Sequence, residues 1–316
     1  MTALTASSAA MGAEDWPSRP LIMVVPFAAG GTSDVIGRIV AEGLRMALGQ
    51  AVIVENLGGA GGMTGSARVA KAAPDGYQLL LGNVGTHAQN QSLYKRPLYN
   101  AAHDFTPVAL VSDQSLVLVA RRDFPADTLQ DFIAYAKNNQ RRLQYGSAGT
   151  GGSNHLACVL LNSVIGIEVT HVPYRSGGQA MQDLIAGRID YQCPSLPVAG
   201  PHITGGLVKP LAILSRTRSF ILPALATADE QGLTGFDIPT WYALFLPKAA
   251  PASLVKKLHA ATIAALHIPS IHERLKEIGG EPVAAERSSP QYLEHLVASE
   301  IEKWARVIKG LGIQVD

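Results

Sequence analysis

The chain has 316 residues, with 26 Lys and Arg against 25 Asp and Glu, so its formal net charge is +1. Hydrophobic residues make up 47% and charged residues 16%, which is typical of a globular protein and excludes a disordered one. Basic residues form no cluster, which argues against nucleic acid as a partner. No apolar run approaches the roughly 20 residues of a membrane span.

The sequence allows two interpretations of the amino terminus, residues 1–15. Residues 1–13 are small, weakly apolar and uncharged, and Ala10-Met11-Gly12 resembles the cleavage site of a secretory signal. This segment lacks the basic start and the long apolar centre of a typical secretory signal. We therefore expect either the remnant of a signal peptide or a disordered tail.

The first third of the chain alternates between strand and helix patterns, which favours a mostly parallel sheet flanked by helices. The predicted elements are a strand over 21–26, a helix over 33–48, a strand over 51–55, a helix ending at Ala70, a strand over 77–81 and a helix starting at Thr86.

The alternation of strands and helices is interrupted between residues 106 and 122, where two strand-like runs follow each other, and then resumes. The predicted elements are strands over 108–111 and 116–121, helices over 128–137 and 155–164, a strand over 169–174, a helix over 179–186, strands over 190–193, 211–214 and 241–246, and helices over 253–266, 270–278 and 290–309.

This order predicts one α/β unit interrupted by a second, with the strands at 116–121 and 241–246 crossing between them. We place the first lobe at residues 16–115 and 242–316, and the inserted second lobe at 116–241. A ligand between the lobes would lie at the carboxyl ends of parallel strands, where open α/β sheets bind ligands.

Two glycine-rich turns stand between a strand and a helix, at residues 26–34 and 145–155. A turn of this kind presents free backbone N–H groups at a helix start, where the helix dipole favours an anion. A single turn of this kind is more simply explained as an ordinary capped turn between a strand and a helix. Its repetition indicates a small anionic ligand held from both sides.

Enzyme and cofactor motifs are incomplete. The glycines at 58–65 fail the dinucleotide pattern because Thr64 occupies the last glycine position, and Ser147 lacks the preceding glycine of a hydrolase elbow, since residue 145 is Tyr145. The nine histidines form no metal-binding pair at HxH or HxxxH spacing. We expect no catalysis, no cofactor and no metal.

The two cysteines, Cys158 and Cys193, form neither a CxxC pair nor a metal-finger spacing. A single disulfide requires an oxidising compartment, and two buried free thiols are the simpler interpretation. The sequence leaves both open.

Other polar strand ends supply further candidates. Thr86 and His87 are expected to line the cleft wall. Arg175 follows a strand and has the geometry to pair with a carboxylate, although an exposed arginine at a helix start is an equal alternative. Asp190 is expected mainly to cap a turn, with a smaller chance of touching the ligand.

Several of these motifs together resemble the Bug family, the extracytoplasmic solute receptors of tripartite tricarboxylate transporters. They run in order from Trp16 and are Val25-Pro26-Phe27-Ala28-Ala29-Gly30-Gly31-Thr32-Ser33-Asp34, Val54-Glu55-Asn56, Ala73-Pro74-Asp75-Gly76-Tyr77, Gly85-Thr86-His87-Ala88, Gly146-Ser147-Ala148-Gly149, Val172-Pro173-Tyr174, Ala186-Gly187-Arg188-Ile189-Asp190 and Trp241-Tyr242.

The resemblance implies a type II periplasmic-binding-protein fold, with two α/β lobes closing on an organic acid. It implies that the turn at 27–34 binds one carboxylate, partly through waters, and that the turn at 147–153 adds donors from the other lobe. Where many members have an acidic and an amide residue after the strand at 190–193, this chain has Pro194 and Ser195. The change argues against an amino-acid ligand.

We therefore predict a periplasmic, monomeric solute receptor that passes a small organic acid, preferably a dicarboxylate or aromatic carboxylate, to membrane transporter subunits. A sensor subunit for a signalling partner and, less favoured, a small-molecule hydrolase or transferase are the alternatives. The predicted ligand-binding residues are Phe27, Ala29, Gly30, Gly31, Thr32, Ser33, Asp34, Thr86, His87, Ser147, Ala148, Gly149, Thr150, Ser153, Arg175 and Asp190.

Overall fold

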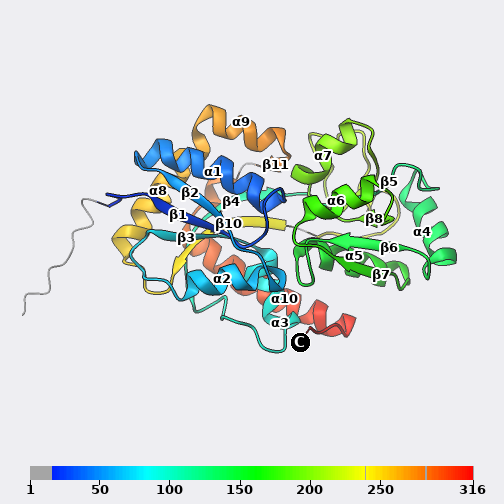
Figure 1. Cartoon of the computed structure of the whole chain (residues 1–316), viewed down its shortest axis with the longest axis horizontal. Coiled ribbons are helices and arrows are strands. Elements are labelled where there is room, and N and C mark those ends of the chain that lie inside the picture. Colours follow the sequence, from blue (N-terminus) through cyan, green and yellow to red (C-terminus); the bar gives the residue numbers. More distant parts are fainter. Residues whose placement is uncertain (1–15, 239, 282, 316) are drawn as a thin grey trace, which may run out of the picture.

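The computed structural model describes residues 16–238, 240–281 and 283–315, so the prediction for residues 1–15 lies outside the described residues. Two α/β lobes, each built on its own sheet, lie side by side along the long axis (Figure 1). This arrangement confirms the predicted fold class. The residue boundaries of the lobes, 16–115 with 242–316 and 116–241, remain our proposal.

The first lobe contains a six-stranded sheet in the order β11-β4-β10-β3-β1-β2. β1 pairs in parallel with β2 and β3, whereas β10 runs antiparallel to both β3 and β4, so the sheet is mixed rather than mostly parallel. Its strands are β1 (Leu21–Val25), β2 (Val52–Asn56), β3 (Gln78–Asn83), β4 (Phe105–Gln114), β10 (Thr240–Pro247) and β11 (Gly280–Glu281).

The second lobe contains a five-stranded sheet in the order β7-β6-β8-β5-β9. β6 is parallel to β7 and β8, and β5 is antiparallel to β8 and β9. Its strands are β5 (Val117–Arg121), β6 (Gln144–Ser147), β7 (Thr170–Pro173), β8 (Tyr191–Gln192) and β9 (Val208–Ile213).

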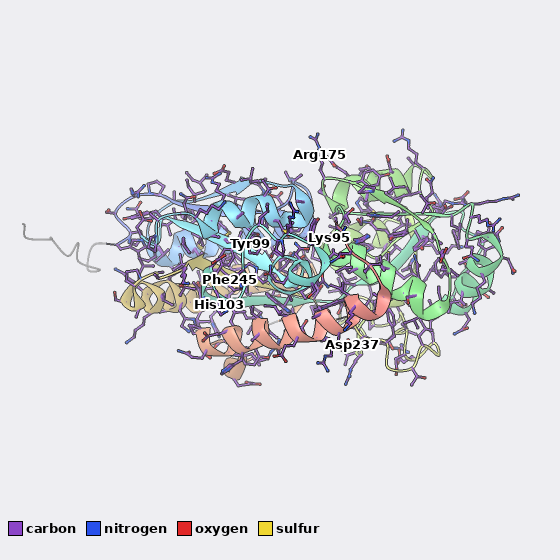
Figure 2. All side chains as sticks on the ribbon, turned by 90° about the horizontal axis from the view of Figure 1, so that it is seen from below. Lys95, Tyr99, His103, Arg175, Asp237 and Phe245 are labelled. Carbon is purple, nitrogen blue, oxygen red and sulfur yellow. A yellow bond between two sulfur atoms is a disulfide. The ribbon has the colours of Figure 1, made fainter. Side chains whose placement is uncertain are left out.

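Helices cover both sheets. Those of the first lobe are α1 (Thr32–Leu48), η1 (Ala60–Gly62), α2 (Met63–Ala70), the π-helical η2 (Gly85–Gln89), α3 (Asn90–Leu93), α8 (Ala252–His267), α9 (Pro269–Glu277), η3 (Ala285–Arg287) and α10 (Pro290–Leu311). Those of the second lobe are α4 (Leu129–Asn139), α5 (Ser153–Ile165), α6 (Gly177–Ile185) and α7 (Leu196–Thr204). Helix α10 runs along the first lobe toward the second (Figures 1 and 2).

Strand β1 shows how the first lobe divides its core. Met23 and Val25 are buried on one face of the sheet with α1 and α8, whereas Val24 belongs to the apolar cluster on the other face with α2 and α10. Successive side chains of a strand point to opposite faces, so a fully apolar strand between two helical layers buries both.

The chain passes from the first sheet to the second at Ser115–Leu116 and returns between β9 and β10. The strands expected to cross, at 116–121 and 241–246, therefore each lie within one sheet and flank the crossings. The two connections touch, since the Ser215 hydroxyl donates to the Ser115 hydroxyl over 3.1 Å.

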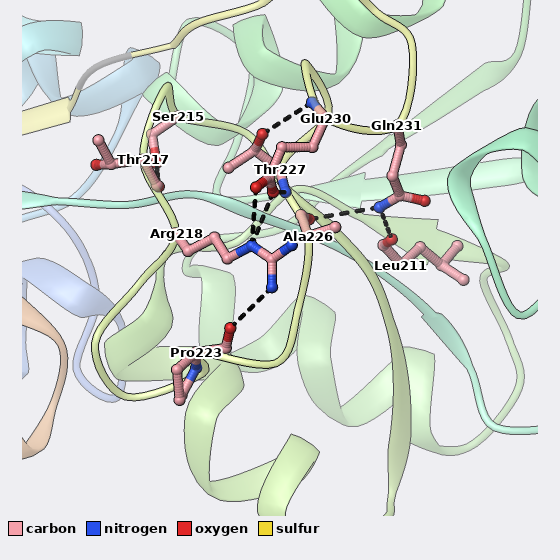
Figure 3. A network of polar contacts seen from close by, with 9 residues as sticks. All are labelled: Leu211, Ser215, Thr217, Arg218, Pro223, Ala226, Thr227, Glu230 and Gln231. Carbon is pink, nitrogen blue, oxygen red and sulfur yellow. Dashed lines mark hydrogen bonds and ion pairs between the residues drawn. The ribbon is translucent and has the colours of Figure 1, made fainter.

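The long return connection is held against the second lobe by its own polar contacts (Figure 3). Arg218 pairs with Glu230 at 2.8 Å and donates to the Pro223 carbonyl at 3.1 Å. The Gln231 amide donates to the carbonyl of Leu211 on β9 at 2.8 Å. Most of this connection is thus tied to the second lobe by polar contacts.

Helix α7 was not predicted, because prolines interrupt its sequence. Pro197 occupies its first turn, where the missing N–H is no loss, and Pro201 lies inside it. The structure also decides the state of the two cysteines, which the sequence left open: Cys158 of α5 and Cys193 after β8 form a disulfide, with Cα atoms 5.7 Å apart. Both side chains are fully buried between helix and sheet.

Candidate ligand-binding cleft

A cavity lies between the two lobes, and we call it the inner chamber. Most of its walls follow the carboxyl ends of β1, β3, β6, β7 and β8, as expected for parallel strands. It is lined by Phe27, Gly31, Thr32, Ser33, Asn83, Leu116, Ala148, Gly152, Ser153, Asn154, Ser176, Gly177, Pro194, Ser195, Val198 and Tyr242.

Four helices begin at this chamber. The residues that precede α1, α5, α6 and α7, which are Gly31, Gly152, Ser176 and Ser195, all line it. Within the described ranges, none of the lining residues is Asp, Glu, Lys, Arg or His. Each helix start carries a partial positive charge, so the chamber favours an anion without a basic side chain.

Backbone donors on both lobes remain available to that anion. Among the described residues, the N–H groups of Thr32 and Ser33 on α1 and of Ser153 and Asn154 on α5 have no protein acceptor. They are the first N–H groups of their helices, which have no partner inside the helix. A ligand held by all four would bridge the lobes.

The first glycine-rich turn uses one of its predicted donors internally. The Gly30 N–H donates to the Asp34 carboxylate at 3.0 Å, and Arg38 pairs with the same carboxylate at 3.0 Å. Burial raises the pKa of Asp34, but the bonds from Arg38 and Gly30 outweigh it and leave the pKa below its ordinary value. Ala29 and Gly30 are exposed outside the chamber lining, so the donors begin at Gly31.

The second glycine-rich turn is occupied by its own contacts. Its N–H groups at Ala148, Gly149 and Gly151 donate to Asn154, Ser147 and His155 respectively. The Ser147 hydroxyl lies 2.6 Å from His171 Nε2 and is fully buried behind the chamber wall. The expectation that this turn offers a row of free amides differs from the structure, which instead presents the start of α5.

Comparisons with known proteins agree with this geometry. Residues 36–313 match the family described as the tripartite tricarboxylate transporter family receptor. The chain belongs to this receptor family. A UPF0065 protein of Agrobacterium vitis is 39% identical over 312 residues, which is 99% of this chain and 90% of that protein. The family prediction is therefore confirmed.

Two solved structures resemble the receptor over nearly its whole length. The periplasmic binding protein BugD has a TM-score of 0.91 and 37% identity, covering 95% of this chain and 99% of that one. MatC from Rhodopseudomonas palustris, solved with bound malate, has a TM-score of 0.90 and 37% identity, covering 93% of this chain and 100% of that one.

Thr86 and His87, expected on the cleft wall, lie in the core of the receptor. Both are fully buried in η2, where the Thr86 hydroxyl contacts His87 Nδ1 at 2.9 Å and the His87 ring stacks on Phe245 at 3.7 Å. Burial lowers the pKa of His87 to about 3, which keeps its ring neutral. The Thr86 hydroxyl accepts a hydrogen bond from the Asn83 N–H and so supports the end of β3. Neither Thr86 nor His87 lines the inner chamber.

Asp190 lies at the wrong end of its strand for ligand contact. It precedes β8, accepts from the Gln144 N–H at 2.8 Å and pairs with Arg121 at 3.1 Å. The chamber is at the opposite, carboxyl end of β8, where Pro194 and Ser195 lie. The capping role that the sequence favoured for Asp190 thus matches its position.

The structure adds lining residues that were not among the predicted ones. Asn83 and Tyr242 face each other on neighbouring strands β3 and β10, and burial raises the pKa of Tyr242 to about 12, so its hydroxyl stays protonated. Asn154, Ser176 and Ser195 line the opposite side. Each of the two serines directly precedes a helix. Serine is a preferred residue at this position, so the sequence did contain a signal for both.

The lobes touch across the cleft. The hydroxyl of Thr32 contacts that of Ser195, and the Tyr94 hydroxyl donates to the Thr150 carbonyl at 2.8 Å. Glycines allow this approach: a Cβ on Gly178 would collide with the Gly30 carbonyl of the other lobe. These contacts join the two lobes beside the inner chamber.

A larger space, which we call the outer chamber, lies beside the inner one. Phe27 and Ala148 line both chambers. The other lining residues are Ala28, Asn56, Gly58, Gly59, Ala60, Gly61, Gly62, Tyr94, Gly149, Thr150, Tyr174 and Arg175.

Proposed function

We propose that this receptor captures a small organic acid, preferably a dicarboxylate or an aromatic carboxylate, and presents it to the membrane subunits of a tripartite tricarboxylate-type transporter. One observation carries the proposal: four helix starts, with four N–H groups that have no acceptor among the described residues, converge on a chamber whose described lining includes no charged side chain. Such a site stabilises negative charge through backbone dipoles and hydrogen bonds.

The same chamber disfavours an amino-acid ligand. An ammonium group buried in it would need a carboxylate or several acceptors, and the described lining offers no acidic side chain. Pro194 and Ser195 stand where the ammonium partner would be expected. The bound malate of MatC, a protein 37% identical to this one, supports a dicarboxylate.

Family membership supports transport rather than signalling or catalysis. Members are solute-binding receptors, which are not enzymes. The Ser147 and His171 pair could suggest a nucleophile, but Ser147 is fully buried and is not among the residues that line the chamber. We propose that the receptor acts in the periplasm as a monomer. Within the part of the chain that the structure describes, no helix combines the length and apolar character needed to cross a membrane.

Calorimetry and thermal unfolding test the proposal directly. We expect malate and succinate to bind the purified receptor and to raise its unfolding temperature, because a ligand that binds only the folded form stabilises it. Succinamide, which has the same shape without charge, should not bind. Equal binding of succinamide, or tighter binding of aspartate than of succinate, would contradict an anion site of this kind.

A further inference from the structure

Asn154 places a side-chain amide in the inner chamber, and its own turn fixes the direction of that amide. It is the second residue of α5, lines the chamber and has 8% of its surface exposed. Its Oδ1 accepts the Ala148 N–H at 3.2 Å. The reverse orientation would set the NH2 group against another donor, so the bond to Ala148 determines which end of the amide stays available.

The available end is the NH2 group. Among the described residues, no hydrogen bond joins Nδ2 of Asn154 to a protein acceptor. Nδ2 lies toward the start of α6, 3.6 Å from the place that a Cβ on Gly177 would take. Gly31 of the first lobe adjoins the same helix start, since its own Cβ would lie 3.8 Å from the Gly177 nitrogen. Two N–H donors therefore remain for a ligand where the lobes meet.

Asn83 of the first lobe is oriented by the same kind of contact. Its Oδ1 accepts the Thr86 N–H at 3.0 Å, and it lines the same chamber. Every other polar side chain in the described lining is a hydroxyl, which can rotate and either donate or accept. The two asparagines are thus the side chains whose direction is set by the protein, and both present their NH2 groups.

Donors of fixed direction discriminate where the backbone does not. The free N–H groups of the helix starts bind a carboxylate, and an amino acid carries one just as a diacid does. At Nδ2 of Asn154 a carboxylate oxygen accepts a hydrogen bond, whereas an ammonium group would face N–H groups without an acceptor. Asn154 differs from Asn83 in standing at a helix start, where the helix dipole adds to the preference for an anion.

We propose that Asn154 is a specificity-determining residue of this receptor. Its NH2 group donates to a carboxylate of the bound acid and excludes a cationic group from the same place. This inference rests on the proposed function and names the side chain that selects among carboxylate ligands.

Calorimetry with succinate and L-aspartate at pH 7 tests the inference on two variants. Asn154→Ala should weaken succinate binding about tenfold, as the loss of a hydrogen bond to a charged group does. Asn154→Asp keeps an acceptor for the Ala148 N–H but turns the free end into oxygen. It should weaken succinate binding about a hundredfold, since repulsion adds to the lost bond, and strengthen L-aspartate binding about tenfold, since its carboxylate pairs with the ammonium group.

The pH dependence distinguishes a ligand contact from a structural effect. A buried carboxyl group beside a bound anion has a raised pKa, and once protonated it donates a hydrogen bond again. The succinate affinity of Asn154→Asp, relative to that of the wild type at the same pH, should therefore recover as the pH falls from about 7.5 to about 5.5. Asn154→Ala has no group to titrate and should not recover.

Asn138→Asp is the matched control. Asn138 is an exposed residue of α4 in the same lobe, outside the inner chamber, and its replacement changes the net charge equally. It should change the affinity for neither ligand. Unfolding temperatures of all variants without ligand report whether they fold.

The outcomes separate this inference from the function on which it rests. Unchanged succinate binding in Asn154→Ala, or a loss in Asn154→Asp that does not recover at low pH, overturns the contact between Asn154 and the acid and leaves the acid receptor standing. Unchanged L-aspartate binding in Asn154→Asp overturns the exclusion of a cation. An equal loss of succinate binding in Asn138→Asp also overturns the inference, because charge alone would then explain the effect. If the wild-type receptor binds no succinate, both proposals fail.

Discussion

The two glycine-rich turns look alike in the sequence, yet they serve the cleft differently. The turn before α1 ties one N–H, that of Gly30, to Asp34 and leaves the start of the helix open. The turn before α5 ties three N–H groups to Asn154, Ser147 and His155 before its helix begins.

This difference teaches that glycine content alone does not create an anion site. Glycines allow tight turns, as at Gly30, with φ of 81°, and Gly149, with φ of 105°. The donors that remain free come from the helix starts that the turns position, because the first N–H groups of a helix lack internal partners. In both lobes the first N–H groups of a helix stay free. A simple turn precedes α1, whereas a turn held by additional hydrogen bonds precedes α5.

Removing a single N–H from each helix start should have the largest effect. Proline is tolerated at the first position of a helix, and both preceding residues are extended: Gly31 has ψ of 172° and Gly152 has ψ of 149°. We expect Thr32→Pro and Ser153→Pro each to weaken binding of a dicarboxylate by about ten- to a hundredfold, as the loss of a charge-assisted hydrogen bond does. Calorimetry measures both.

Thr32→Val and Ser153→Ala are the controls, since they remove the hydroxyls and keep the N–H groups. They should cost much less affinity than the prolines. If a proline variant binds like its control, the corresponding helix start does not hold the ligand. A large loss for Thr32→Pro without one for Ser153→Pro would assign the carboxylate to the first lobe alone.

A smaller effect is expected on stability, and it should also distinguish the turns. Asp34→Ala removes the acceptor of both Gly30 and Arg38, and should lower the free energy of unfolding by about 2 kcal/mol. Ser147→Ala loses contacts between neutral groups and should cost about 1 kcal/mol. Urea unfolding at pH 7 measures both. The reverse order would mean that the second turn is the more tightly held.

The smallest effect is on the pH dependence of stability. Burial lowers the pKa of His171 to about 4, and burial with the neighbouring His171 lowers that of His155 to about 3. The unfolded chain binds these protons from about pH 6.5 downward and the folded chain does not, so stability falls as the pH drops from 6.5 toward 4. Asp34, whose pKa lies below 3.8, keeps its contribution over this range.

His171→Gln should therefore reduce the pH slope of the unfolding free energy by about 1 kcal/mol per pH unit between pH 6 and 5. Urea unfolding at several pH values gives this slope. Asp34→Ala should leave the slope over the same range unchanged, because that carboxyl group is ionised in both states. An unaltered slope in His171→Gln would show that the histidine is not held neutral by burial.

Local patterns predicted the long elements well. The helix expected over 33–48 is observed as Thr32–Leu48, because its apolar residues repeat at helical spacing and Gly49 ends it with φ of 70°. Helix α7 was not predicted, since its prolines signal a break, and only its packing against α6, β5 and β9 within the second lobe shows that a helix fits there. The disulfide depended equally on packing, because α5 brings Cys158 to Cys193 across 35 residues.

The cleft was predicted in part. The turn after β1 and the start of α5 were found from glycines and helix signals near each other in the chain. Tyr242 was not among the predicted ligand residues, because its place opposite Asn83 depends on the pairing of β10 with β3, strands separated by most of the chain. His87 was misplaced for a related reason: a polar residue after a strand can face the cleft or the core, and here the aromatic ring of Phe245 decides.

By itself, the sequence determined the receptor family, the alternation of strands and helices, and the helix starts at the glycine-rich turns, because each of these depends on residues close together in the chain. The tertiary structure alone decided which N–H groups stay free, which polar side chains are buried in the core and which residues line the inner chamber. Those outcomes depend on which distant groups meet, and a buried donor is available to a ligand only when no part of the folded protein has already taken it.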